Sequence, residues 1–536
     1  MTGIDWVVVA LYFVLVLAAA LLPTWRAART GRDSSEYFLA SRHTGWLVVG
    51  ASLFASNIGS EHLVGLAGTG AASGVAVGQF EVLASLMLLL LGWVFVPFYL
   101  RSGVFTMPEF LERRYSEAAR WYLAVVSIIA YVLTKISVTI AAGGVVFETL
   151  MGVNFWTGAL VVVVATGLYT VIGGLRAVLY TDLLQMFVLI GGSAVVTVSG
   201  LRALGGWDAM VAASAPGMLD MWKPVSDPDF PWTGIVLGAP ILGIWYWCTD
   251  QFIVQRVLAA RDQTQARRGT IFAGFLKLLP VLLFVIPGII AAQLARQGQL
   301  SLAQPDQALP ALVAALLPAG LRGLVVAGLL AALMSSLSGV FNSCSTLITW
   351  DVYRKLHPTA SERRLVRVGQ LATGVLVIFG LLWIPLMKLI SAQLYQYIQS
   401  VQAYIAPQVA AAFLLGILWR RANARGAMTA LVIGFVLGMG RLVAELNKES
   451  LGGALRTYAG INFLHFAAML FAVCVLVLIA ASLTAPPPRP EQVEGITFGG
   501  TRVPARGEDR ARRRVDLMLS GLVVLGVLGT WIYFSE

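Results

Sequence analysis

The sequence predicts an all-helical protein that crosses the lipid bilayer many times. Of its 536 residues, 58% are hydrophobic and 12% are charged, whereas soluble domains have about 45–50% apolar and about 25% charged residues. Apolar runs of about 20 residues, each long enough to span a bilayer, recur along the whole chain. Two of these runs contain glycine or proline together with polar residues near their centres, which is typical of interrupted transmembrane helices.

Fourteen spans are expected. The first run has no basic residue before it and no small-residue cleavage site, so we interpret it as a retained span rather than a signal peptide. The expected spans cover residues 4–23, 45–70, 76–100, 121–147, 154–173, 178–200, 233–256, 270–293, 322–350, 367–386, 393–419, 426–443, 462–483 and 515–533.

The distribution of basic residues predicts the orientation. If the N-terminus is external, the loops expected on the cytoplasmic side, including a short one at 174–177, hold 28 of the 38 Lys and Arg residues, and the other side holds 8. Cytoplasmic loops of membrane proteins are rich in Lys and Arg. We therefore expect a plasma-membrane protein with both termini external and a basic cytoplasmic loop before the last span. The net charge of +11 is explained by these loops, and no nucleic acid partner is expected.

The first interrupted span carries unusually polar residues. Asn57, Glu61 and His62 lie among apolar residues, with several glycines following. Glycine lowers helix propensity, and a break frees backbone carbonyls that are tolerated at membrane depth only where they line a cavity or bind a ligand. Glycines also allow close helix packing. That alternative does not explain three costly polar side chains, which in membranes are usually functional.

A second interruption lies five spans later. Residues 239–251, "APILGIWYWCTDQ", combine Pro240, Gly243, a cluster of three aromatic residues and Asp250. Two inverted repeats of five helices would place their broken helices at this spacing and bring them together at the midplane. The aromatic residues are also compatible with ordinary core packing.

A third polar element lies in the ninth span. Ala332, Ser335 and Ser336 share one face of the predicted helix, and Ser338 lies near that face. Hydroxyl and carbonyl oxygens are hard ligands that suit a hard cation such as Na⁺. Serine side chains that bond to the backbone of their own helix are the alternative interpretation.

The sequence argues against enzymatic activity. No nucleophile–base pair or metal cluster with recognisable spacing appears, and Cys248, Cys344 and Cys474 all lie in apolar segments. There is no phosphate-binding cassette, so a transporter of this sequence would draw energy from an ion gradient. A sensor or channel is a further alternative, which the lack of a signalling domain after the last expected span makes weaker. No obligatory protein partner is expected.

Several long motifs resemble the solute:sodium symporter family, and within it the sodium/glucose cotransporter branch. The resemblance covers about residues 34–445. It rests on "GASLFASNIGSEHLVGLAGTGAASGVAVGQFE", "YTVIGGLRAVLYTDLLQ", "IWYWCTDQFIVQR", "FLKLLP", "LMSSLSGVFNSCSTL", "YIQS" and "GILWRRANARGAMTALVIG". The family implies a leucine-transporter-type core of two inverted five-helix repeats, with one span before it and three after it.

On this basis the chain divides into six segments. Residues 1–44 hold the first span and a cytoplasmic loop, 45–232 the first repeat and an external loop, and 233–425 the second repeat. Residues 426–483 hold two additional spans, 484–514 form a basic cytoplasmic linker, and 515–536 hold the last span.

The resemblance also implies a sodium site. Its ligands would be the backbone carbonyls of Ala55, Ile58 and Ala332 and the hydroxyls of Ser335 and Ser336. A second Na⁺, present in some relatives, would bind Asp182, Ser335 and Ser338. From the residues alone, Asp182 is equally a cytoplasmic exit ligand or a structural acceptor.

The substrate pocket implied by the resemblance suits a sugar. The pocket would comprise Asn57, His62, Phe80, Glu81, Tyr246, Trp247, Lys277 and Gln399. Tyr246 would be the inner gate, Trp247 a stacking platform and Phe80 part of the outer cover. Sugar hydroxyls both donate and accept hydrogen bonds, so such a pocket needs acceptors and donors. Gly243 and Ala84 stand where well-known sugar members have polar residues, and Glu61 where many relatives have glycine.

We therefore expect a symporter that imports a hexose resembling glucose or galactose by alternating access, driven by Na⁺. Alternatives are sodium symport of another small solute (myo-inositol, a monocarboxylate or an amino acid) and proton-coupled sugar symport through Glu61, Glu81 or Asp182.

Overall fold

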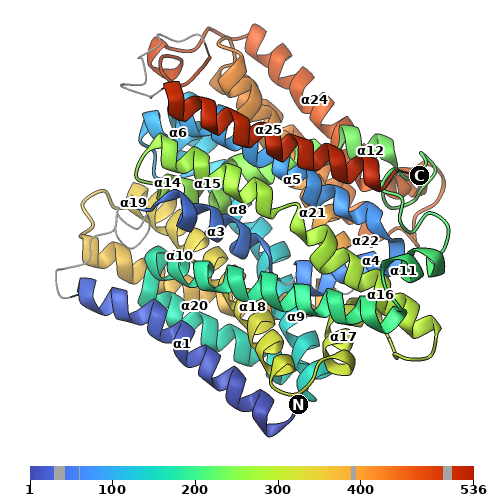
Figure 1. Ribbon diagram of the computed structural model, residues 1–536. Coiled ribbons are helices and arrows are strands. Elements are labelled where there is room, and N and C mark those ends of the chain that lie inside the picture. The colour runs from blue at the N-terminus through green and yellow to red at the C-terminus, as the bar shows by residue number, and fades with distance from the viewer. Residues whose placement is uncertain (29–42, 60, 388–393, 499–509, 536) are drawn as a thin grey trace.

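The computed structural model describes residues 1–28, 43–59, 61–387, 394–498 and 510–535, and within them the secondary structure is helical. The long helices lie side by side in a bundle, and the C-terminus lies beside α11 and α12 (Figure 1). Because a bilayer cannot satisfy exposed backbone groups, an apolar chain of this kind spans it with helices.

Ten helices in the described residues are long and apolar enough to cross a membrane. The ten are Val75–Ser102, Glu117–Met151, Val178–Leu204, Gln263–Arg296, Leu321–Leu356, Glu362–Leu382, Leu394–Leu418, Ala424–Leu446, Phe463–Leu483 and Ala511–Tyr533. Shorter apolar helices lie at Gly3–Val16, Trp46–Asn57 and Phe155–Gly167, and the seventh expected span is a series of short helices. Each of the fourteen expected positions is therefore helical.

The elements before the long loop at 214–231 are bounded as follows: α1 Gly3–Ala28, α3 Trp46–Asn57, η2 Glu61–Leu66, α4 Ala67–Ser73, η3 Val75–Gly78, α5 Gln79–Leu90, η4 Leu91–Phe95, α6 Val96–Ser102, α7 Met107–Arg114, α8 Glu117–Tyr131, η5 Val132–Ile136, α9 Ser137–Val146, η6 Phe147–Met151, α10 Phe155–Leu204 and α11 Trp207–Ala213.

The elements after that loop are α12 Trp232–Leu237, α13 Ala239–Gly243, η7 Ile244–Thr249, α14 Gln251–Leu258, α15 Gln263–Leu276, η8 Val281–Val285, α16 Ile286–Arg296, η9 Pro305–Gln307, α17 Ala308–Leu316, α18 Leu321–Thr346, η10 Leu347–Tyr353, α19 Arg354–Leu356, α20 Glu362–Met387, α21 Leu394–Leu418, α22 Ala424–Leu446, α23 Gly453–Gly460, α24 Phe463–Leu483, η11 Pro490–Gln492 and α25 Arg510–Tyr533.

The prediction of a loop at 174–177 is wrong, because these residues are helical and lie within α10, which has 50 residues. A straight helix of that length would extend about 75 Å, more than twice the hydrocarbon thickness of about 30 Å. The two halves have different neighbours. Gly158 contacts Phe147, which precedes α10, whereas Gly192 contacts Val325 of α18. The segment therefore supplies the length of two spans without an intervening coil.

Part of the segment predicted to be a linker, 484–514, packs against other helices. Residues 484–498 pack on the helix ends: the Gln492 side chain donates to the carbonyl of Tyr115, and the Phe498 amide donates to the carbonyl of Ile417. The Phe498 ring also meets Phe98 edge to face at 5.0 Å. Residues 499–509 of the predicted linker lie outside the described residues, and residues 510–514 already belong to α25, so the last helix begins earlier than expected.

Close glycine contacts hold the first interrupted helix in place. A side chain at Gly288 of α16 would lie 2.0 Å from the carbonyl oxygen of Ala67, and one at Gly65 would lie 2.8 Å from the backbone nitrogen of Tyr395. Neither position has room for a larger residue. Backbones approach this closely in membrane proteins only through small residues, so η2 and α4 are wedged against α16 and α21.

Candidate functional site

The first interruption lies where the polar run predicts it. Helix α3 ends at Asn57, Ile58 leaves the helical conformation (φ −74°, ψ 78°), and helix resumes as the π-helical turn η2. The second interruption is at Asp250, whose extended backbone (φ −77°, ψ 128°) separates η7 from α14. The Asp250 side chain accepts from the Phe252 amide and caps α14. Both breaks are buried, which is the environment that tolerates non-helical backbone at membrane depth.

One of the predicted sodium ligands contacts the last turn of α3. The Ser336 hydroxyl of α18 donates to the carbonyl oxygen of Ser56 at 2.8 Å, in the last turn of α3. Ala55, Ile58 and Ala332 are fully buried, and Ser336 is 3% exposed. The hydrogen bond therefore joins one of the assigned residues, Ser336, to the last turn of α3, although α3 and α18 are far apart in the sequence.

The residues of the second predicted site form a buried polar cluster. Asp182 of α10 accepts from Ser335, and from Ser56 at 2.8 Å. The guanidinium of Arg256 donates to Ser56 at 2.9 Å. The Ser338 hydroxyl donates to the carbonyl of Ser335 and so bonds within its own helix. Asp182 thus already lies in a satisfied network that includes a cation, while Ser338 has the backbone bond expected of an ordinary helical serine.

A cavity of about 60 Å³ lies beside the first break, between helices of both halves of the chain. Seven of the eight predicted pocket residues line it, and the eighth, Lys277, bonds to two of them. The lining residues are Asn57, His62, Phe80, Glu81, Leu83, Ala84, Met87, Ala239, Leu242, Gly243, Tyr246, Trp247, Tyr395, Ile398, Gln399 and Gln402.

Charged groups in this cavity are paired with one another. The Lys277 ammonium, which is fully buried, donates to Glu81 and Asn57. His62 Nε2 lies 2.9 Å from the other carboxylate oxygen of Glu81. Buried charges are tolerated when they are paired and hydrogen-bonded. The cavity therefore offers hydrogen-bond donors and acceptors, and the charges of Lys277 and Glu81 neutralise each other.

Lys135 is a residue that the motif comparison missed. Its ammonium donates to the Tyr246 hydroxyl at 2.8 Å and lies 4.0 Å from the centroids of the Tyr246 and Phe252 rings. The Asn57 side-chain amide also donates to the Tyr246 hydroxyl, at 2.8 Å. An ionisable residue within a span is a sequence signal of function, and the sequence contains it in the fourth expected span. Lys135 links the predicted inner gate to a helix outside the pocket motifs.

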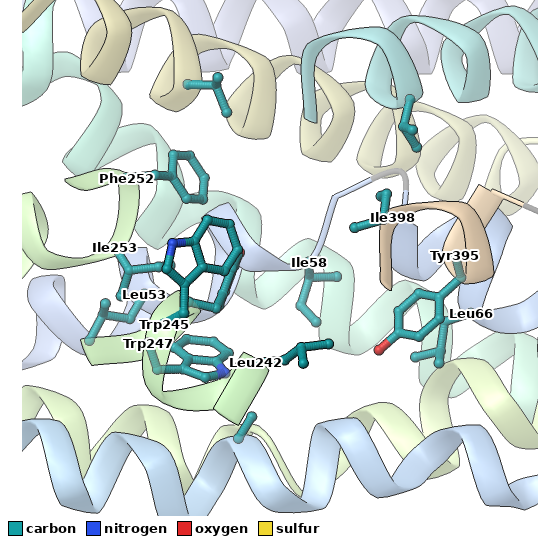
Figure 2. Packing of buried hydrophobic residues seen from close by; sticks show 14 of the residues in the cluster. Leu53, Ile58, Leu66, Leu242, Trp245, Trp247, Phe252, Ile253, Tyr395 and Ile398 are labelled. Atoms are coloured by element: carbon teal, nitrogen blue, oxygen red, sulfur yellow. The ribbon is translucent and has the colours of Figure 1, made fainter. Parts of the chain in front are cut away.

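Aromatic and aliphatic side chains cover the polar network. In the view of Figure 2, Ile58 lies between Trp245 and Trp247 on one side and Ile398 and Tyr395 on the other. The Phe80 ring meets the Tyr395 ring at 6.0 Å. Tyr395 and Gln402 were missed because they lie outside the quoted motifs, and Ile398 because only Gln399 of the "YIQS" motif was assigned to the pocket; all three enter the lining through the packing of α21.

The two departures from the sugar members lie in the cavity wall. Gly243 and Ala84 both line it, and a side chain at Gly243 would lie 2.8 Å from Met87. A larger residue at position 243 therefore requires Met87 to move. The backbone of Glu61 begins η2, while its side chain lies outside what the structure describes.

Comparison with known proteins identifies the family of this chain. The profile of the Sodium:solute symporter family matches residues 37–434. The chain is 39% identical to the mouse sodium/myo-inositol cotransporter, over 92% of this chain and 75% of that protein. It is 38% identical to the rabbit sodium/glucose cotransporter 1, over 90% of this chain and 79% of that protein.

Solved structures show the same fold. A Na⁺-coupled sialic acid symporter in a substrate-bound outward-open state matches with a TM-score of 0.77 at 21% identity, covering 91% of this chain and 99% of that one. The nucleobase-cation-symport-1 family transporter Mhp1 matches with a TM-score of 0.53 at 11% identity, covering 87% and 99%. The fold is the expected leucine-transporter type, with interrupted helices at its centre.

These matches confirm the family and the transport class, and they leave the solute open between the two kinds of relative. The chain is a multi-pass membrane protein and not an enzyme, and its coupling ion is Na⁺. It is a sodium-coupled solute symporter that belongs to the sodium:solute symporter family, in the sodium/glucose cotransporter branch.

Proposed function

We propose that this symporter imports a hexose resembling glucose or galactose across the plasma membrane by alternating access. The observation that carries the proposal is the paired network of Glu81, Lys277, Asn57 and His62 in a cavity walled by aromatic rings. Acceptors and donors serve the hydroxyls of a sugar, and Trp247 offers an aromatic face for the C–H face of a pyranose.

The charge balance of the cavity favours a neutral solute. A carboxylate substrate needs a cation to pair with, because an unpaired buried charge is very costly. Lys277 is already bonded to Glu81 and Asn57. A monocarboxylate would have to displace Glu81 from Lys277, whereas a polyol can share the existing donors and acceptors.

We place the coupling Na⁺ between α3 and α18. Its ligands are the carbonyls of Ala55, Ile58 and Ala332 and the hydroxyls of Ser335 and Ser336. Support comes from the bond of Ser336 to the Ser56 carbonyl, which places one proposed ligand beside the last turn of α3. A second Na⁺ at Asp182, Ser335 and Ser338 is the weaker proposal, because Arg256 already supplies positive charge to that cluster.

Binding of Na⁺ at this place couples the ion to the pocket through one helix. The carbonyl of Ile58 follows Asn57 directly, so an ion that orders the end of α3 also positions the Asn57 side chain toward Lys277 and Tyr246. Release of Tyr246 from Asn57 and Lys135 then opens the inner side. With the expected topology the membrane potential adds about 2.3 kcal/mol per charge per 100 mV.

The second candidate solute is myo-inositol. It is favoured by the 39% identity to the mouse sodium/myo-inositol cotransporter, and its ring of hydroxyls makes the same demands on the pocket. Gly243 and Ala84 have no polar side chains, so neither position can offer a side-chain hydrogen bond that would distinguish a hexose from myo-inositol.

The test is uptake of labelled glucose, galactose and myo-inositol into proteoliposomes under an inward Na⁺ gradient, with K⁺ and a pH gradient as controls. We expect accumulation of a hexose only with Na⁺, and its loss in Ser336→Ala. Thr346→Val is the matched control on α18, because the Thr346 hydroxyl bonds only its own helix.

Three results would contradict the proposal. Accumulation of myo-inositol and of neither hexose would contradict the assignment of the solute, but it would leave the proposed sodium site unchanged. Accumulation that follows pH and ignores Na⁺ would contradict the coupling. Full Na⁺-driven uptake by Ser336→Ala would place the ion elsewhere.

A further inference from the structure

A buried polar stripe continues along α18 beyond the proposed sodium site. Five residues recur at spacings of three and four, and at about 100° per residue they fall within an arc of about 80° on one helix face. Each of the five is at most 1% exposed. The stripe consists of Ser335, Ser338, Asn342, Ser345 and Thr349.

The lower part of the stripe lacks hydrogen-bond partners. Within the part of the chain that the structure describes, neither atom of the Asn342 amide group has a partner, and neither do the hydroxyls of Ser345 and Thr349. A buried polar group left unsatisfied costs about 1–3 kcal/mol, and native proteins rarely leave such groups without protein or water partners. Several in a row on one helix face therefore point to a path that water enters in another conformation.

The two ends of the stripe carry carboxylates. At the upper end Ser335 donates to Asp182. At the lower end Thr349 lies in the π-helical turn η10 together with Asp351, which accepts from Thr106 at 2.9 Å and from Arg120 at 2.6 Å. π-Helical turns are frequent at functional sites. The stripe therefore begins beside Asp182 and ends in η10, where Asp351, two residues after Thr349, lies on another face of the turn.

The stripe is long enough to serve as a path. The helix rises about 21 Å from Ser335 to Thr349, at 1.5 Å per residue. Half of the hydrocarbon thickness is about 15 Å, so the stripe is long enough to reach from mid-bilayer to the interface. It leads toward the loop at 357–361, which the distribution of basic residues places in the cytoplasm. An imported ion has to leave on this side.

We propose that Na⁺ is released to the cytoplasm along this stripe, with the Asn342 amide oxygen as its first ligand below Ser335 and the hydroxyls of Ser345 and Thr349 as the next. The proposal rests on the proposed sodium site between α3 and α18. In the conformation seen here α18 packs against α10, α14 and α20, and the stripe is buried. Opening of the inner side hydrates it, and the unsatisfied groups then gain partners.

The first test separates sodium release from sodium binding with Asn342→Leu, a change of similar size without polar atoms. Net Na⁺-driven uptake includes ion release, whereas solute exchange with saturating Na⁺ on both sides does not. We expect net uptake to fall at least tenfold, exchange to stay within about twofold, and Na⁺-dependent thermal stabilisation to persist. Asn342→Ser, which keeps an oxygen, should recover net uptake to within about threefold of the wild type.

The matched control is Thr346→Val, one turn further along the same helix. Net uptake by Asn342→Leu within twofold of the wild type would overturn the proposal. A joint loss of exchange and of sodium-dependent stabilisation would also overturn it, because Asn342 would then belong to the ion site or to the packing.

The second test needs no solute and so stands apart from the sugar assignment. Asn342→Cys, Ser345→Cys and Thr349→Cys are made in a chain whose three native cysteines are replaced, and modification by Ag⁺ is followed from the cytoplasmic side. We expect modification at all three positions and its suppression by Na⁺. Native Cys344, fully buried and off the stripe, is restored alone as the matched control and should stay unmodified. The proposed path would be contradicted if Ag⁺ modified Cys344 as readily as the three introduced cysteines, or if it modified none of the three.

Discussion

Single side chains decide what the central cavity can bind. Glu81 and Lys277 come from α5 and from the residue after α15, and they are 3% and 0% exposed. The two charges neutralise each other, and His62 remains bonded to Glu81 while Asn57 accepts from Lys277. Sequence motifs placed all four residues in one pocket, but the direct bond between Glu81 and Lys277 is a product of the packing of α5 against α15.

The first prediction concerns this pair. Glu81→Gln and Lys277→Met should each destabilise the protein by about 3–5 kcal/mol, because each leaves a buried charge without its partner. The double variant should recover most of this stability, since no lone charge remains. Uptake should be abolished in all three variants. Unfolding in detergent and proteoliposome uptake are the two measurements, and a double variant as unstable as the sum of the singles would contradict the pairing.

At the scale of elements, the broken helices are held by the segments that cover them. The outer half of the first broken helix, α4, is packed against η9: a side chain at Gly68 would lie 2.3 Å from a carboxylate oxygen of Asp306. The other Asp306 oxygen accepts from the Leu394 amide at the start of α21, at 3.1 Å. One carboxyl group thus joins three elements on the side that is expected to be external.

The second prediction is a pH dependence from Asp306. Burial raises the pKa of this carboxyl to about 7, against the opposing effect of the hydrogen bond from the Leu394 amide. Between about pH 4 and pH 7 the folded protein therefore binds more protons than the unfolded chain. Its stability should fall as pH rises through this window, by at most about 1.4 kcal/mol per pH unit. Above pH 7 the contribution of this group becomes constant.

The variant Asp306→Asn keeps an acceptor oxygen and removes the charge. Its thermal unfolding temperature, followed from pH 5 to pH 8, should therefore depend less on pH than that of the wild type. Asp227→Asn, a change in another external loop, is the control. Equal pH dependence in wild type and Asp306→Asn would show that Asp306 does not titrate in this window.

Across the whole molecule, helices outside the central core hold distant parts of the chain together. The last helix, α25, is attached by Asp516, which is fully buried and paired with Arg267 at 3.0 Å and Arg268 at 2.8 Å, both on α15. Its far end is attached by Trp531, whose ring nitrogen donates to Gln79 at 2.6 Å. This helix therefore spans the bundle and is fastened at both ends (Figure 1).

The third prediction follows from that attachment. Asp516→Asn should cost about 3–5 kcal/mol, because Arg267 is nearly buried and loses its countercharge. Asp262→Asn is the matched control: its partner Arg261 is 63% exposed, and exposed pairs contribute about 0–1 kcal/mol. Asparagine also preserves the cap that Asp262 provides to α15. Thermal unfolding compares the two, and equal losses would contradict a structural role for Asp516.

The sequence by itself determined the membrane class, the fourteen helical positions and the two interruptions, and the family resemblance supplied seven of the residues that line the cavity. These are local properties: hydropathy of each run, glycine and polar residues within a run, and motif spacing. The break at Asn57 and the one at Asp250 both appear where polar residues interrupt apolar ones.

Only the tertiary structure decided the rest, because it depends on which helices touch. The docking of 484–498, the bond of Lys135 to Tyr246 and the entry of α21 into the cavity wall all arise between segments far apart in the chain. The unpartnered amide of Asn342 belongs to the same class. A sequence shows that a residue is polar, but only its packed neighbours show whether its hydrogen bonds are made.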